Sequence, residues 1–132
     1  MNCIFCKIIN SEIPAYKLWE NERFLALLDI NPIKPGHLVV MPKAHYSDLY
    51  EMPEDLYSEL FSIIKKIAPL LKKETGSKRV GLVVEGFGVD HIHVHLVPIN
   101  MGNELNPENA VKATADDLQS MQGRIKKAFE VL

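Results

Sequence analysis

Residues 89–98 read VDHIHVHLVP and place three of the chain's five histidines, His91, His93 and His95, at every second position. Successive side chains of a β-strand point to opposite faces, so we expect the three imidazoles on one face of a strand. The apolar residues between them would face a core. This apolar set explains a strand over residues 92–98, but it does not explain the histidines.

Three roles for this histidine row are open at this point. A packing role is weak for three histidines in register, because histidine has no special preference for strands. Two imidazoles from a His-x-His strand can bind a catalytic zinc, with a further ligand from elsewhere and water completing the site, as in a metal-dependent hydrolase. A neutral imidazole can instead attack an electrophilic phosphorus or carbonyl near pH 7, while its neighbours hold the phosphoryl oxygens and protonate a leaving group.

The remaining sequence predicts an α+β fold with a five-stranded, mainly antiparallel sheet. Four further strands, separated by turn and loop signals, are expected at residues 16–20, 23–29, 37–42 and 79–85. A long central helix is expected to begin near Pro53 and to end near Gly76, and Pro69 should kink or weaken it. A C-terminal helix is expected over roughly residues 114–131, with Thr114 as its cap.

The composition predicts one globular domain that spans residues 1–132. The apolar fraction of 47% and the charged fraction of 24% are those of an ordinary soluble protein. A net charge of -2 supports neither nucleic acid nor a membrane surface as a partner. No apolar run reaches the length of a membrane span, and the N-terminal stretch MNCIFCKIIN lacks the features of a signal peptide. We therefore expect a cytoplasmic protein.

The stretch HIHVHLV (91–97) resembles the signature of the histidine triad (HIT) family. Residues 3–45 also resemble the N-terminal half of that family, including DINP (29–32) and PGHLVVMPKAH (35–45). The likeness covers most of residues 3–98 in the expected order, and two well-spaced motifs make it specific. It implies a HIT-like fold and a hydrolase or nucleotidyl transferase. The substrate would be a purine nucleotide conjugate attacked at the α-phosphate, either a phosphoramidate or a dinucleoside polyphosphate.

The resemblance also implies roles for single residues. His93 corresponds to the nucleophile that forms a nucleotidyl-histidine intermediate, which water then hydrolyses without any metal. His95 would contact the phosphate and assist the leaving group, and His37 corresponds to a further histidine near the site. Asp29 stands where the family binds the ribose, and a carboxylate can accept hydrogen bonds from both hydroxyls. A turn residue at the end of a strand is an equally good interpretation of Asp29.

The chain departs from the family pattern in EGFGVDH (85–91). Many members have a longer glycine-rich loop here, with a GQS or GQT element whose polar side chains help at the leaving group. Backbone N–H groups near Gly88 and Val89 remain able to bind a phosphate. Asp90 would repel a phosphate or accept a proton from the leaving group. The sequence therefore does not identify which leaving group the protein accepts.

Cys3 and Cys6 are the chain's two cysteines and form one Cys-x-x-Cys pair. A stable disulfide is not expected in the cytoplasm, and a thioredoxin-like redox motif would follow a strand. A structural zinc needs four ligands, so two histidines must come from elsewhere. A subgroup of the family, which this chain resembles, supplies them from positions that correspond to His45 and His91. The alternative is two buried free thiols and an exposed His45.

Three functions remain open from the sequence. The first is HIT-type hydrolysis through His93, and the second is a zinc-dependent hydrolase with the metal on the histidine row. The third is a nucleotide-binding adaptor with little turnover, which the missing polar loop residues and Asp90 suggest. The resemblance further implies a homodimer with two sheets joined edge to edge, whereas the residues alone require only that an edge strand is protected.

Overall fold

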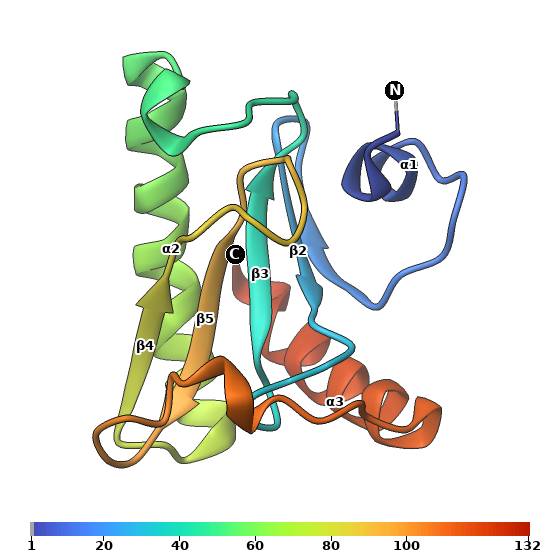
Figure 1. Ribbon diagram of the computed structural model, residues 1–132. Coiled ribbons are helices and arrows are strands. Elements are labelled where there is room, and N and C mark those ends of the chain that lie inside the picture. Colours follow the sequence, from blue (N-terminus) through green and yellow to red (C-terminus); the bar gives the residue numbers. More distant parts are fainter. Residues whose placement is uncertain (1) are drawn as a thin grey trace.

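Five strands and three α-helices make up the fold of residues 2–132, the part of the chain that the computed structural model describes (Figure 1). In chain order the elements are α1 (Ile4–Ile9), β1 (Lys17–Glu20), β2 (Phe24–Leu28), β3 (Leu38–Pro42), α2 (Glu54–Thr75), β4 (Arg79–Val83), β5 (Val94–Ile99) and α3 (Ala115–Ala128). Short 3-10 turns lie at Leu49–Glu51, Pro107–Asn109 and Phe129–Val131. All strand pairs are antiparallel, and the strand order is β1-β2-β3-β5-β4. The predicted α+β fold is confirmed.

Alternation along the strands gives the sheet two different faces. The face against α2 and α3 carries the larger apolar core, to which the strands contribute Phe24, Ala26, Val40, Val94 and Leu96. The opposite face carries a smaller cluster in which α1 packs on the sheet, made of Ile8, Leu25, Leu27, Val39 and Met41. The face that α1 partly covers is the one that also holds the histidines described below.

The long helix α2 begins and ends where its sequence predicts. Pro53 occupies the N-cap, the first turn is acidic and the last turn is basic, which suits the helix dipole. Gly76 ends the helix in the left-handed conformation with φ 68°, and its N–H donates to the carbonyl of Lys72 at 2.9 Å. The helix runs through Pro69 as one segment, so any weakening there does not end it.

The histidine strand begins later than its alternation predicts. β5 starts at Val94, so His91 and His93 lie in the approach to the strand and not within it. The N–H of Ile92 donates to the carbonyl of Tyr46 at 2.7 Å, a loop partner that replaces a sheet partner. β4 likewise ends at Val83, before the predicted end of its strand at residue 85. These shorter strands leave residues 84–93 free to form a loop beside the histidines.

The C-terminal helix is confirmed as α3, followed by a 3-10 turn through residue 131. Thr114 caps it, because its side-chain oxygen accepts the N–H of Asp117 at 3.1 Å. Leu118 and Ile125 bury its apolar stripe in the larger core. Within residues 2–132, no helix combines the length and the apolar character needed to cross a membrane.

The segment between β5 and α3 is fastened to the loop that precedes β3. The carboxylate of Glu104 accepts the N–H groups of Asn100 and Met101 at 2.5 and 2.7 Å and pairs with Lys34. These contacts, the one to Lys34 first, lower the pKa of Glu104 to about 2. Leu105 lies over Gly81 of β4, where an added Cβ would come within 2.8 Å of its side chain. The segment therefore closes one side of the sheet face that carries the histidines.

Candidate active site and metal centre

A cavity of about 800 Å³ opens on the sheet face that α1 partly covers. Side chains from α1, from the strands, from the loop between β4 and β5 and from residues 105–110 line it. Six of the residues predicted to act on a nucleotide lie in its wall, namely Asp29, His37, Gly88, Val89, His93 and His95. The structure thus brings the predicted catalytic and nucleotide-binding residues into one cavity.

The structure defines which ring nitrogen of His93 carries the lone pair. Its Nδ1 lies 2.7 Å from the backbone carbonyl of His91. A carbonyl only accepts hydrogen bonds, so Nδ1 carries the proton and the lone pair of neutral His93 is on Nε2. Phe5 packs edge-on against the ring, with the two centroids 4.9 Å apart, and restrains its rotation. A fixed imidazole with a free lone pair is the arrangement that a nucleophile requires.

A chain of hydrogen bonds sets the proton positions of His37 and His95. The N–H of Ile33 donates to Nδ1 of His37 at 3.0 Å, so neutral His37 carries its proton on Nε2. That Nε2 donates to Nδ1 of His95 at 2.9 Å. Neutral His95 then carries its own proton on Nε2, and its ring centroid is 4.9 Å from that of His93. The chain therefore leaves His95 with a hydrogen-bond donor on Nε2, in a ring that packs edge-on against His93.

Asp29 follows β2 and faces the same two imidazoles. One carboxylate oxygen, Oδ2, lies 3.5 Å from Nε2 of His37 and 3.8 Å from Nδ1 of His95. The other, Oδ1, accepts the N–H of Asn31 at 2.8 Å, which is the turn contact expected of an aspartate at a strand end. The turn interpretation of Asp29 thus describes a real contact, and the same turn holds the carboxylate in the cavity wall, where ribose binding stays a prediction.

Burial keeps the two paired histidines neutral. The pKa of His95 falls to about 4, first because the ring is buried and then because charge on His93 and His37 would repel a proton. Burial also lowers the pKa of His37. The carboxylate of Asp29 acts in the opposite direction on both groups but does not outweigh burial. At pH 7 both imidazoles are neutral, as the hydrogen-bond chain requires.

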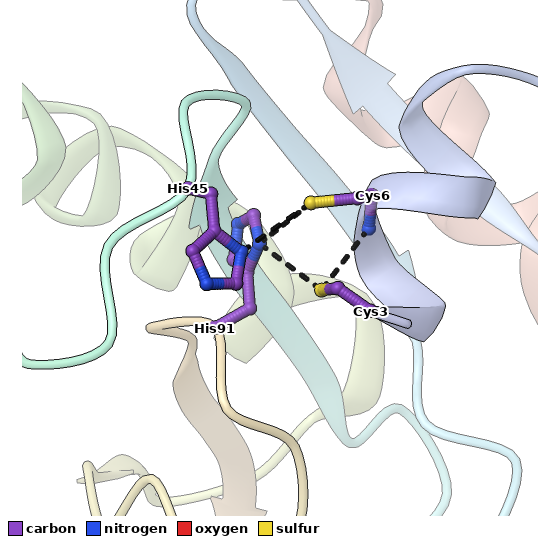
Figure 2. Close-up of side chains that lie close together, drawn as sticks. All are labelled: Cys3, Cys6, His45 and His91. Carbon is purple, nitrogen blue, oxygen red and sulfur yellow. Dashed lines mark hydrogen bonds between the residues drawn. The ribbon is translucent and has the colours of Figure 1, made fainter. Parts of the chain in front are cut away.

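Cys3, Cys6, His45 and His91 converge from three parts of the chain (Figure 2). Their ligand atoms all lie within 4.8 Å of one another. The separations of sulfur from histidine Nδ1 are 3.4 Å for Cys6–His45 and 3.5 Å for both Cys6–His91 and Cys3–His91. A tetrahedral zinc, bound at about 2.3 Å to sulfur and about 2.1 Å to nitrogen, would separate such atoms by about 3.6 Å. The four side chains therefore fit a zinc ion closely.

The proton positions in this cluster also suit a metal. Nε2 of His91 lies 2.8 Å from the carbonyl of Pro42 and must donate to it, which leaves the lone pair on Nδ1, toward the sulfurs. The N–H of Cys6 donates to the sulfur of Cys3 at 3.3 Å. His45 is half-buried, so the alternative is wrong in its expectation of an exposed His45. Burial is the main cause that lowers the pKa of His91.

The structure divides the histidine row between different sets of neighbours. His91 belongs to the cysteine cluster, His95 joins His37 and Asp29, and His93 is in neither of these groups with metal-ligand spacing. The ligand atoms of Asp29, His37 and His95 also lie within 4.8 Å of one another. A metal on Nε2 of His37 would force its proton onto Nδ1, against the N–H of Ile33. That clash disfavours a metal there.

Three parts of the site were missed from the sequence. α1 was not predicted, because six residues are too few to show a helical period. Phe5, inside the Cys-x-x-Cys stretch, packs edge-on against both His91 and His93, with centroids at 5.9 and 4.9 Å. Its place between two expected zinc ligands was a usable signal. The N–H of Ile33 and the carbonyl of Pro42 act through the backbone, which leaves no mark on the sequence.

Comparison with known proteins gives a consistent result. Residues 10–101 match the HIT domain family. An uncharacterized HIT-like protein of Methanocaldococcus jannaschii is 46% identical over 101 residues, which cover 73% of this chain and 78% of that protein. An adenosine 5'-monophosphoramidase of Candida albicans is 37% identical, over 74% of this chain and 70% of that enzyme. An adenylylsulfatase of Arabidopsis thaliana is also 37% identical, over 74% of this chain and 52% of that enzyme.

Solved structures of similar proteins share the fold. A hypothetical histidine triad nucleotide-binding protein of Sulfolobus tokodaii superimposes with a TM-score of 0.86 at 29% identity, covering 98% of this chain and 93% of that chain. A zinc-bound histidine triad family protein of Mycobacterium smegmatis gives a TM-score of 0.79 at 25% identity, covering 100% of this chain and 99% of that chain. The structural likeness thus extends over α3, beyond the residues that match the family.

Proposed function

The chain belongs to the HIT domain family, and from this premise we propose that it hydrolyses a purine nucleotide conjugate at the α-phosphate. Nε2 of His93 attacks phosphorus, and the leaving group departs with a proton. Water then cleaves the N–P bond of the nucleotidyl-His93 intermediate and releases the nucleoside monophosphate. The observation that carries the proposal is the contact of His93 Nδ1 with the carbonyl of His91, which leaves Nε2 as the reactive nitrogen in a cavity of nucleotide size.

The other cavity residues have complementary roles in this proposal. His95 donates from Nε2 to a phosphoryl oxygen or to the leaving group, and His37 holds it in that tautomer. The negative charge of a bound phosphate would raise the low pKa of His95, so that it gains a proton to pass on. Asp29 accepts hydrogen bonds from the ribose hydroxyls, and backbone N–H groups near Gly88 and Val89 bind the phosphate.

The names of the relatives support an adenylyl donor as the first substrate to test. The Candida albicans enzyme is named for a phosphoramidate and the Arabidopsis thaliana enzyme for an adenylyl sulfate. These two names share the adenylyl half and differ in the leaving group. The proposal therefore commits to the nucleotide half, with a phosphoramidate or a dinucleoside polyphosphate as the conjugate.

We further propose that Cys3, Cys6, His45 and His91 bind a structural zinc, as in the zinc-containing subgroup of the family. The sulfur–nitrogen separations and the free lone pair on His91 Nδ1 support it, and the similar protein of Mycobacterium smegmatis is described as zinc-bound. The metal would anchor α1, whose Phe5 and Ile8 line the cavity. No step of the chemistry passes through it.

The deciding experiment combines product release with detection of the intermediate. Adenosine 5'-phosphoramidate should release AMP, and mass spectrometry of quenched enzyme should find an adenylyl group on the peptide that carries His93. A folded His93→Ala protein, checked by circular dichroism, should show neither. Equal turnover by this variant would end the proposal.

A nucleotide-binding protein with little turnover is the second candidate. It is favoured by the short loop at residues 85–91, which lacks the usual polar side chains, and by the exposed carboxylate of Asp90. Calorimetry with AMP and a product assay on the same sample separate the two candidates, because tight binding without AMP release would favour the second. Loss of turnover on chelation, with no adenylyl-His93, would instead favour a zinc-dependent hydrolase.

We also propose a homodimer in the cytoplasm. Within the described residues β4 pairs with β5 alone, so its outer edge is open, and its side chains Arg79 and Leu82 are exposed. Such an edge is a site for strand pairing with a second copy. Cys3 and Cys6 are not joined in a disulfide, and reduced cysteines suit a reducing compartment. Light scattering would test the dimer, and a monomer at micromolar concentration would contradict it.

A further inference from the structure

The C-terminal helix α3 contributes two glutamines to the wall of the cavity. Gln119 and Gln122 lie three positions apart, on one side of α3, and both line the cavity. They stand outside residues 10–101, the part of the chain that matches the HIT domain family. The proposed attack at phosphorus gives neither side chain a role, so the helix brings polar groups to the cavity for another purpose.

One hydrogen bond fixes the amide group of Gln122. Its Nε2 donates to the backbone carbonyl of Lys17 at 2.9 Å, and this contact defines the amide because a carbonyl only accepts. The amide oxygen, Oε1, is therefore the group that Gln122 has left to offer a ligand. Gln122 is half-buried, whereas Gln119 is exposed. Of the two glutamines, Gln122 thus presents an acceptor in a defined place.

The strand order places this acceptor on the side of Asp29 away from the proposed catalytic histidines. The order is β1-β2-β3-β5-β4, with Lys17 at the start of β1 and Asp29 just after β2. The N–H of Leu28 donates to the carbonyl of Tyr16 at 2.9 Å, so the approach to β1 lies directly beside the end of β2. One strand spacing of about 4.8 Å and one hydrogen bond separate β2 from the Gln122 amide, roughly 8 Å in all. A nucleotide with its ribose at Asp29 would therefore extend its base toward Gln122.

The surroundings of Gln122 suit the base of a nucleotide. Pro14 and Ala15 precede β1, Ile30 follows Asp29, and all three line the cavity with apolar groups that can cover the faces of a purine. No lysine or arginine of residues 2–132 lines the cavity. The edge of the purine would then be distinguished by hydrogen bonds. Adenine carries an amino donor at position 6, where guanine carries an oxygen acceptor.

We propose that Gln122 is a specificity-determining residue, whose Oε1 accepts a hydrogen bond from the 6-amino group of adenine. This inference rests on the proposed function and narrows its purine to adenine. Guanine or hypoxanthine would bring a carbonyl oxygen against Oε1, which would leave two acceptors without a donor between them. The hydrogen bond to Lys17 opposes the rotation of the amide that would present Nε2 to such a base.

The experiment compares kcat/KM among the 5'-phosphoramidates of adenosine, purine riboside and inosine, which carry an amino group, a hydrogen and an oxygen at position 6. The wild type should favour adenosine over inosine about tenfold, with purine riboside between them. Gln122→Met, which has a similar length and no amide, should lower the adenosine rate to that of purine riboside. Gln122→Lys keeps a donor for the carbonyl of Lys17 and presents only donors to the base, so it should favour inosine over adenosine.

The control is Ser120→Ala, which removes another polar side chain of α3. Ser120 is exposed and does not line the cavity, so this variant should keep every ratio of the wild type. Equal wild-type rates with adenosine and inosine, or wild-type ratios in folded Gln122→Met and Gln122→Lys, would overturn the inference and leave the proposed function standing. Failure of the wild type to release a nucleoside monophosphate from any probe would overturn the proposed function itself, and the inference with it.

Discussion

Two clusters with metal-ligand spacing lie on the same face of this sheet, and the backbone treats them in opposite ways. In the cysteine cluster Nε2 of His91 donates a hydrogen bond to the carbonyl of Pro42, so the lone pair on Nδ1 points toward the sulfurs. In the Asp29 cluster the N–H of Ile33 donates a hydrogen bond to Nδ1 of His37, so the proton on Nε2 points toward His95. One main-chain hydrogen bond thus decides whether each imidazole turns a lone pair or an N–H toward its cluster.

His93 lies between the two clusters and belongs to neither. Its backbone neighbour His91 fixes its tautomer, and its ring neighbour His95 supplies the adjacent donor. The proposed nucleophile thus depends on both clusters for its orientation and on neither for its lone pair. This division predicts that activity and zinc binding can be lost separately.

Removal of the nucleophile should have the largest effect. We expect His93→Ala to lower kcat by a factor on the order of 10⁴, because the covalent route is lost, while zinc content stays at one per chain. Steady-state AMP release and metal analysis of the same sample measure both. A variant that keeps its rate but loses its zinc would reverse the roles of the two clusters.

Removal of the cysteines should affect zinc binding and stability far more than activity. Cys3→Ser combined with Cys6→Ser should abolish zinc binding and lower the free energy of unfolding by about 3 kcal/mol, because structural zinc contributes directly to folding. At a temperature where the variant is folded, kcat should stay within about tenfold of wild type. Urea unfolding and metal analysis measure the effect, and chelator-treated wild type is the control. Zinc retained by the double variant would contradict the assigned ligands.

A smaller effect is expected at Asp29. Asp29→Asn keeps a side-chain acceptor for Asn31 but removes the charge beside His37 and His95, so kcat/KM should fall about tenfold, mainly through KM. Zinc should remain at one per chain, since the Asp29 cluster is not expected to bind metal. A second zinc in the wild type that Asp29→Asn abolishes would show that both clusters bind metal.

Much of this arrangement follows from local sequence, and the exceptions have physical causes. Alternation predicted β5 and the common face of the histidines, and Pro53, Gly76 and Thr114 marked the helix ends. The start of β5 was placed too early, because a loop carbonyl at Tyr46 replaces the sheet partner of Ile92. α1 has no periodicity of its own and is stable only through its contacts. The tautomers depend on backbone groups brought close by tertiary folding, which no residue pattern records.

The smallest expected effect is on the pH dependence of stability. The pKa of His95 is about 4 in the folded chain against an ordinary 6.5, so between these values the unfolded chain binds a proton that the folded chain does not. The stability that neutral His95 contributes is therefore fully present above pH 6.5 and is lost as the pH falls toward 4. Because the ring is partly exposed, we expect a loss of about 1 kcal/mol.

The matched variant for this titration is His95→Gln, which keeps a hydrogen-bonding side chain and does not titrate. Urea unfolding of both proteins at pH 7 and pH 5 measures the difference. The variant should lose less stability than the wild type between these two values. Equal losses would show that burial does not lower the pKa of His95 as described.

The zinc site proposed at the cysteine cluster also has a consequence for the order of folding. Cys3 and its partner His91 are separated by 88 positions, so the cysteines are synthesised long before the ligand that completes their site. A helix as short as α1 does not persist alone, and closing so long a loop is slow until the sheet exists. We expect zinc uptake, followed with a chromogenic zinc dye during refolding, to come after the sheet has formed. The earliest helix to be made would then be the last to dock, and the cavity would gain that wall only as the metal binds.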